Sequence, residues 1–325
     1  MRAPAIDPGQ RTTSPRLPSP RLLAVSLATG SLLLAACSSA PSGPATKSTA
    51  GVIRVVAAEN EYGNVAAQIG GKYVRVTSVE SNPNTDPHTY EVSPGVAEAV
   101  SAAQVVIQNG VGYDDFMTKI ESASANSTRQ VIDVQHLLRL PDSTPNPHLW
   151  YSPTTMPKVA EALAVDFATL QPTHAAYFKS EAATFITSLQ PWLAAIARFR
   201  AAYPRTDVAS TEPVADYMLE AAGADNLTPF GFQADIMNGV DPSPEDVTLQ
   251  TSLFTGHKVK VFVYNEQVTD SLTESFITAA QKAGIPIIGV YETMPTPGFT
   301  YQSWMLAEVQ ALQRAVADKA STVKL

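Results

Sequence analysis

Short runs rich in β-branched residues alternate with helical patterns along most of the chain, and this alternation constrains the fold more than any other feature. A strand followed by a helix and then by another strand builds parallel βα units of the α/β class. In the first half the expected strands cover residues 52–57, 74–79, 105–108 and 131–134. In the second half they cover residues 208–210, 259–264 and 285–290. We therefore expect two α/β lobes, one from each half of the chain.

Helical patterns follow these strands, and they cover residues 60–69, 93–102, 154–169, 214–222, 243–251, 269–283 and 301–317. The longest helical stretch, residues 173–203, is rich in alanine and repeats apolar residues with a period near 3.6. Pro191 should kink or interrupt it, because proline cannot donate the backbone hydrogen bond of a helix. The expected domains are an N-terminal α/β lobe at residues 52–170, a connecting helix at 171–203 and a C-terminal α/β lobe at 204–325.

The first 37 residues have the pattern of an export signal. Arginines precede an apolar run at residues 22–36, which is too short for a membrane span of ~20 residues, and small residues lead to Cys37. The run resembles the lipobox of bacterial lipoproteins, whose cysteine takes a lipid and becomes the mature N-terminus. We expect a lipoprotein signal peptide at residues 1–36, and a lipidated Cys37 followed by a flexible tether at 37–51. The alternative is a plain secretory signal with a chance cysteine.

Composition excludes several classes of protein. The chain has 30 acidic and 22 basic residues, a formal net charge of −8, whereas nucleic-acid binders present a basic face. The single cysteine excludes a disulfide framework and a cysteine-based zinc or iron–sulfur site. The sequence also lacks the HExxH, GxSxG and GxxxxGK[ST] motifs of common hydrolases and nucleotide-binding proteins.

Two of the five histidines lie in loops of similar sequence. His88 and His148 each follow a proline, and each has a short polar residue, Asp86 or Asn146, two positions before it. The proline stiffens the loop, and the polar side chain can bond the local backbone. The aromatic that follows each histidine, Tyr90 or Trp150, can shield the site. The repeated pattern favours a shared ligand site over two unrelated loop residues. The other histidines have no such setting and are expected on the surface or in helix packing: His136, His174 and His257.

Two glutamates follow expected strands of the second half. Glu212 comes after the strand at 208–210, and Glu292 comes after the strand at 285–290. Ligands of α/β proteins bind at the carboxyl ends of strands, so both are candidates for the same site. The alternatives are a first-turn acid favoured by the helix dipole for Glu212 and an exposed loop acid for Glu292.

Three segments together resemble the zinc/manganese-type solute-binding lipoproteins of bacterial ABC importers. They are DPHTYEVSP at residues 86–94, NGVGYD at 109–114 and PHLWYSP at 147–153. The resemblance implies two α/β lobes joined by a long helix, with one metal ion in the cleft between them. It implies His88, His148, Glu212 and Glu292 as the ligands, with Glu266 as a reserve for the fourth.

The same resemblance implies a protein that is not an enzyme. Its expected role is to capture a divalent transition metal outside the cell and deliver it to a membrane permease and its ATPase, as a monomer anchored by lipid to the outer face of the bacterial cytoplasmic membrane. The expected cargo is Mn²⁺ or Zn²⁺, with Fe²⁺ as a third candidate.

The ligand set has its own chemical consequences. Two neutral imidazoles and two carboxylates leave a formally neutral site with a divalent ion. Glutamates that bind through both oxygens raise the coordination number to five or six, which favours Mn²⁺ or Fe²⁺, although Zn²⁺ binds most such sites more tightly. Binding should weaken below a pH of ~6.5, where imidazole becomes protonated.

Two other functions remain open at this point. A metal-dependent hydrolase would use the same cleft, but it usually keeps one metal position free for an activated water. A surface adhesion or scaffold lipoprotein would have the fold without the metal.

Overall fold

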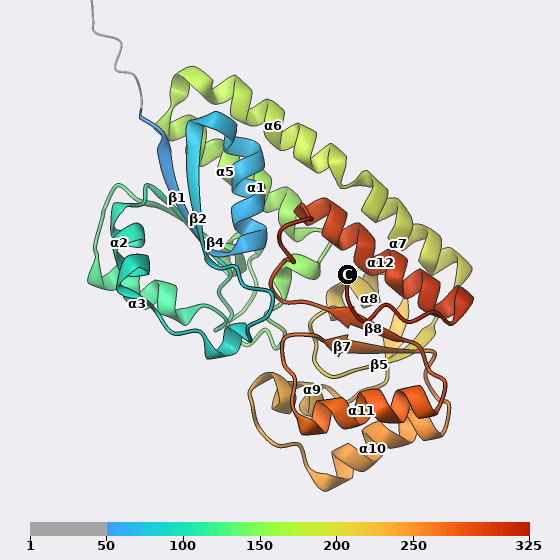
Figure 1. The fold of residues 1–325 in the computed structure, drawn as a ribbon. Coiled ribbons are helices and arrows are strands. Elements are labelled where there is room, and N and C mark those ends of the chain that lie inside the picture. Colours follow the sequence, from blue (N-terminus) through green and yellow to red (C-terminus); the bar gives the residue numbers. More distant parts are fainter. Residues whose placement is uncertain (1–50) are drawn as a thin grey trace, which may run out of the picture. The chain divides into compact units, whose positions relative to one another are not determined.

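Two four-stranded parallel sheets organise residues 51–325, the part of the chain that this computed structural model describes (Figure 1). The first sheet has the order β2-β1-β3-β4 and the second has the order β6-β5-β7-β8. Their strands are β1 (Ile53–Glu59), β2 (Val74–Glu80), β3 (Val105–Gln108), β4 (Gln130–Asp133), β5 (Thr206–Ser210), β6 (Ala224–Asn226), β7 (Val261–Asn265) and β8 (Ile287–Val290). The predicted fold class, two α/β lobes, is confirmed. The predicted signal peptide, Cys37 and all of the tether except Gly51 lie outside the described residues.

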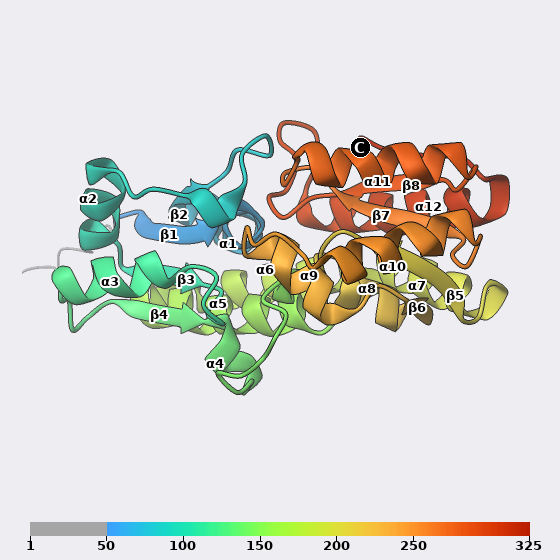
Figure 2. The same cartoon turned by 90° about the horizontal axis from the view of Figure 1, so that it is seen from below.

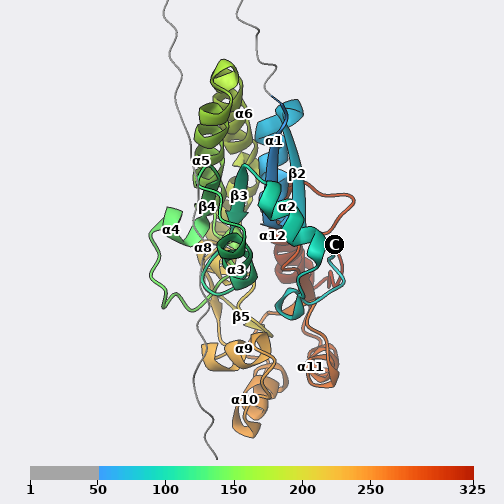
Figure 3. The same cartoon turned by 90° about the vertical axis from the view of Figure 1, so that its left-hand side faces the viewer.

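Helices cover both faces of the first sheet. Alternate residues of β1 point to opposite sides: Val55 and Ala57 join the core beneath one set of helices, and Val56 and Ala58 join the core beneath another. The first set is α1 (Asn60–Gly70), α5 (Thr155–Leu170) and α6 (Ala175–Ser188), and the second is α2 (Pro94–Ala102) and α3 (Asp115–Ala123). Figure 3 views this lobe from the side of α2 and α3.

The second sheet is covered in the same way (Figure 2). Phe262 and Tyr264 of β7 pack beneath α9 (Phe230–Met237), α10 (Pro244–Thr255) and α11 (Ser271–Lys282). Val261 and Val263 face the opposite side, with α8 (Asp216–Ala221) and α12 (Tyr301–Asp318). Strands buried on both faces explain why β7 reads as a continuous apolar run in the sequence.

Two helices, rather than one, connect the lobes. The helical pattern of residues 173–203 is divided into η4 (Pro172–His174), α6 and α7 (Gln190–Ala202), with Leu189 between α6 and α7. Pro191 lies in the first turn of α7, where a missing N–H costs no hydrogen bond, so it interrupts the stretch as predicted. The largest buried cluster includes residues of both sheets and of α6, α7 and α12, so the lobes share a continuous apolar core on this side.

Several short elements were not predicted from the sequence. They are α3, α4 (Val134–Leu138), β6 and α9, together with the 3₁₀ turns η1 (Gly71–Tyr73), η2 (Pro87–Thr89) and η3 (Leu149–Tyr151). Within the described residues, no helix combines the length and apolar character that crossing a membrane would require.

Candidate metal centre

The His88 loop is shaped by the residues immediately before the imidazole. Asp86 is the N-cap of η2, and its Oδ1 accepts the backbone N–H of His88 at 2.8 Å. Pro87 occupies the first turn, where its fixed φ suits the short helix. The side chain of His88 is 22% exposed, so it lies at the solvent side of the site.

The His148 loop uses the same device and adds a second bond. Asn146 Oδ1 accepts the backbone N–H of His148 at 3.0 Å and lies 2.8 Å from its ring Nδ1. An amide oxygen can only accept, so Nδ1 carries the hydrogen and Nε2 is left to face the site. The predicted local role of the short polar side chain is confirmed in both loops. His148 is fully buried.

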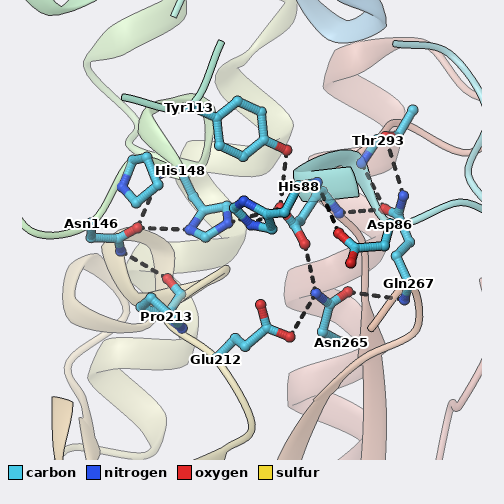
Figure 4. A network of polar contacts seen from close by, with 12 residues as sticks. Asp86, His88, Tyr113, Asn146, His148, Glu212, Pro213, Asn265, Gln267 and Thr293 are labelled. Atoms are coloured by element: carbon cyan, nitrogen blue, oxygen red, sulfur yellow. Dashed lines mark hydrogen bonds and ion pairs between the residues drawn. The ribbon is translucent and has the colours of Figure 1, made fainter. Parts of the chain in front are cut away.

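Glu292 joins these two histidines from the second lobe. Its Oε2 lies 3.1 Å from His88 Nε2 and 3.2 Å from His148 Nε2, and it accepts the Tyr113 hydroxyl at 2.9 Å (the histidines and Tyr113 are labelled in Figure 4). One atom each from His88, His148 and Glu292 lie within 4.8 Å of one another. The structure therefore brings three of the four predicted site residues into one cluster.

The protonation states follow from burial and from this contact. Burial favours the neutral form of Glu292, but the two imidazoles outweigh it and hold the pKa of Glu292 well below its ordinary value. Burial likewise opposes charge on His88, yet Glu292 and Asp86 raise its pKa overall. For His148 burial prevails over the attraction of Glu292, and its pKa is lowered.

Glu212 is buried beside the cluster and reaches it through Asn265. The Nδ2 of Asn265 donates to Glu212 Oε1 at 3.0 Å and to Glu292 Oε1 at 2.7 Å. Glu212 Oε2 is buried and has no hydrogen-bond partner. Burial and the nearby Glu292 carboxylate raise the pKa of Glu212, while the bond from Asn265 partly offsets them.

The remaining candidates lie elsewhere. Glu266 is half-buried and its Oε2 lies 3.8 Å from Lys324 Nζ, so the structure does not bring it into the cluster. His136 pairs with Asp133 on the surface, His174 stacks on Tyr73, and His257 is exposed. Tyr90, the aromatic after His88, packs on Phe116 instead of shielding the imidazole.

Tyr113 provides the shielding that was expected of Tyr90. Its ring meets the rings of His88 and His148 edge-on, with centroids 5.2 Å and 5.8 Å away. The turn before it depends on Gly110, which has a φ of +77° and lies so close to Gln135 that a side chain would collide. The segment at 109–114 was noted as a motif, but no role could be assigned to Tyr113 from sequence.

Buried amides join the ligand loops of one lobe to those of the other. Gln267 Oε1 accepts the backbone N–H groups of Glu292 and Thr293, each at 2.7 Å, and its Nε2 donates to Thr85 O at 2.8 Å. Asn146 Nδ2 donates to Pro213 O, directly after Glu212, at 2.8 Å. These bonds hold both histidine loops against the loops that carry the glutamates.

A group of buried acids lies behind the site and was not foreseen. The carboxyl oxygens of Glu59, Glu61 and Glu80 are buried without a hydrogen-bond partner. Burial raises the pKa of all three, that of Glu80 to about 9, and neighbouring carboxyls add to the effect. The raised pKa favours the neutral form of these carboxyls, which is the form that costs less to bury.

A divalent transition metal fits this donor set. Imidazole nitrogen and carboxylate oxygen are ligands of zinc, manganese and iron, and the unpartnered Glu212 Oε2 is a donor that the protein itself leaves unused. The fold and the site together define a two-lobed α/β protein with a buried histidine–carboxylate cluster between the lobes, the class of the metal-binding solute-binding proteins.

Comparison with known proteins places the chain in one family of this class. The family described as "Zinc-uptake complex component A periplasmic" matches residues 55–315, and the chain belongs to it. The predicted resemblance to metal-binding solute-binding proteins of ABC importers is thereby confirmed. This family consists of transport components rather than enzymes.

Individual relatives are distant in sequence, and the solved structures compared are similar in fold. The manganese-binding lipoprotein MntA of Bacillus subtilis is 24% identical over 252 residues, which cover 74% of this chain and 79% of MntA. The solute-binding protein FpvC from Pseudomonas aeruginosa, solved with Mn²⁺, has a TM-score of 0.68 at 19% identity, over 83% of this chain and 100% of FpvC. The periplasmic zinc-binding protein TroA from Treponema pallidum also has a TM-score of 0.68, at 18% identity and the same coverage.

Proposed function

We propose that this protein captures a single divalent transition metal ion outside the cell and delivers it to an ABC-type permease. The observation that carries the proposal is the convergence of His88 Nε2, His148 Nε2 and Glu292 Oε2, with the unpartnered Glu212 Oε2 beside them. We assign these four residues as the ligands. Mn²⁺ and Zn²⁺ are the leading candidates for the cargo, since relatives are named for both, and Fe²⁺ is the third.

The geometry supports binding between the lobes rather than on one of them. Both histidines come from loops of the first lobe, and both glutamates follow strands of the second. An ion with all four ligands would therefore connect the two lobes, in addition to the hydrogen bonds that Gln267 and Asn146 make between them. Four protein ligands also leave no obvious position for an activated water, so carrying is favoured over hydrolysis.

The proposed anchoring rests on the sequence before residue 51. A lipid on Cys37 and a tether at residues 37–51 would hold the two lobes at the outer face of the cytoplasmic membrane, within reach of a permease and its ATPase. The naming of the Bacillus subtilis relative as a lipoprotein supports this placement. We propose that the protein works there as a monomer.

Metal content is the direct test. The protein is stripped with chelator, reloaded with Mn²⁺, Zn²⁺ or Fe²⁺ singly and in competition, and assayed by elemental analysis beside His88→Ala. We expect about one ion per chain in the parent and a large loss in the variant. His257→Ala, at an exposed histidine, is the matched control and should bind like the parent. Absence of stoichiometric metal in every condition would contradict the proposal.

A further inference from the structure

Asn265 contacts both glutamates of the site with a single nitrogen. It ends β7 and is 1% exposed, and the two hydrogens of its Nδ2 go to Glu212 Oε1 and Glu292 Oε1 (Figure 4). Its orientation is fixed, because its Oδ1 accepts the backbone N–H of Gln267 at 3.0 Å. A flipped amide would lose that bond and would point its oxygen at two carboxylates.

Each glutamate therefore has one oxygen that Asn265 binds and one that Asn265 leaves unbound. Oε1 of both carboxylates is turned toward the amide. Oε2 of Glu292 lies 3.1 Å and 3.2 Å from the two imidazole nitrogens, and Oε2 of Glu212 has no hydrogen-bond partner. A carboxylate that binds a metal through both oxygens must also turn Oε1 toward the ion, which competes with the hydrogen bond that Oε1 accepts from Asn265.

From this arrangement we propose that Asn265 sets the metal preference of the site by holding Glu212 and Glu292 to one ligand oxygen each. This rests on the proposed function and deepens it. Two imidazole nitrogens and two carboxylate oxygens make a four-coordinate site. Zn²⁺ is commonly tetrahedral with such ligands, whereas Mn²⁺ gains most from additional oxygen donors. Asn265 thus disfavours Mn²⁺ relative to Zn²⁺. The sequence alone predicts the opposite preference, because there the glutamates are assumed to bind through both oxygens.

The proposal is tested by the coordination number and the metal preference of Asn265 variants. Asn265→Leu removes the donor at similar size, and Asn265→Ser replaces the two N–H donors with one hydroxyl on a shorter side chain, with less risk to packing. Asn226→Ser is the matched control: Asn226 ends β6, and its Nδ2 likewise bonds two side-chain oxygens, Ser210 Oγ and Asp216 Oδ1, while contacting no proposed ligand. The full chain is loaded with Co²⁺, whose visible absorption is much stronger in four-coordinate than in six-coordinate sites, and Mn²⁺/Zn²⁺ competition is measured separately.

We expect the parent and Asn226→Ser to give the strong absorption of a four-coordinate site. The Asn265 variants should absorb more weakly, and their affinity for Mn²⁺ relative to Zn²⁺ should rise about tenfold, the scale of one hydrogen bond to a charged group. A six-coordinate spectrum from the parent would overturn the proposal whether or not the variants fold. If the Asn265 variants lost affinity for Mn²⁺ and Zn²⁺ equally and kept the parent's spectrum, the proposal would also be overturned, and Asn265 would have a structural role only. A parent that binds no metal at all would instead overturn the proposed function.

Discussion

Gln267 should control how fast the ion leaves, because it links the Glu292 loop to the loop that precedes His88. Replacing it with methionine keeps the size of the side chain and removes every polar contact. The backbone N–H groups of Glu292 and Thr293 would lose their acceptor, and Thr85 O would lose its donor. A buried N–H left without a partner costs about 1–3 kcal/mol, so two of them should lower the free energy of unfolding by about 3 kcal/mol.

The effect on the metal is expected in the dissociation rate. With the Glu292 loop no longer held to the first lobe, transfer of bound Zn²⁺ to a chromogenic chelator in a stopped-flow experiment should be about tenfold faster in Gln267→Met. Gln302→Met is the matched control, because Gln302 of α12 also joins the lobes, through Gln68 and Ser188, but contacts no ligand loop. An unchanged release rate in a folded Gln267→Met, or an equal acceleration in Gln302→Met, would refute this reasoning.

Three further predictions concern the pH dependence of metal binding, the hydrogen bond of Tyr113 and the buried acid Glu308. Metal affinity should fall as the pH drops, by up to tenfold per pH unit for each imidazole that must lose a proton. The fall should begin above pH 6.5, because the pKa of His88 is raised. Calorimetric titration with metal from pH 8 to 5 measures the affinity, and an affinity that does not change with pH would contradict histidine ligation. Tyr113→Phe removes the hydroxyl bonded to Glu292 and should lower the unfolding free energy of the metal-free protein by about 1.5–3 kcal/mol in urea denaturation, with no change if the bond is unimportant. Burial raises the pKa of Glu308 to about 8, so its stabilising contribution is present below pH 4.5 and lost as the pH rises through 8. At pH 9 the unfolding free energy of Glu308→Gln should therefore exceed that of the parent by several kcal/mol, because each tenfold increase in the proton affinity of the folded state corresponds to about 1.4 kcal/mol. A difference between variant and parent that is equal at pH 5 and pH 9 would contradict the raised pKa.

The fold was largely predictable because its signal is local and repeated. Strands buried on both faces, such as β7, give continuous apolar runs, and the helices between them carry clear stops. The missed elements lack that signal. The strand β6 has only three residues, of which Asp225 and Asn226 are polar, and α9 contains Gly231 and the exposed Phe230.

Only those parts of the site that the local sequence of loops and strand ends indicates could be predicted. The similar loops around His88 and His148 pointed to a pair, and strand ends pointed to Glu212 and Glu292. The amides that organise them could not be found in this way, because Asn265 and its partner Glu212 are 53 positions apart along the chain. Their pairing exists only after the second sheet has formed.

The buried acids are the other feature that sequence reasoning could not supply. A glutamate in a sequence is normally read as a solvent-exposed charge. Glu59 and Glu80 instead end β1 and β2, and the fold buries both of them. Their raised pKa values are consequences of the tertiary structure and leave no mark in the local pattern.

The measurement that tests the central claim most directly is anomalous X-ray diffraction from crystals of the metal-loaded protein, at the absorption edge of the bound ion. The account predicts a single site between the lobes, with the ion about 2.0–2.2 Å from His88 Nε2, His148 Nε2, Glu212 Oε2 and Glu292 Oε2. An ion elsewhere, for example at Glu80 and Asp86, or one that leaves Glu212 uncoordinated, would contradict the ligand set proposed for this protein.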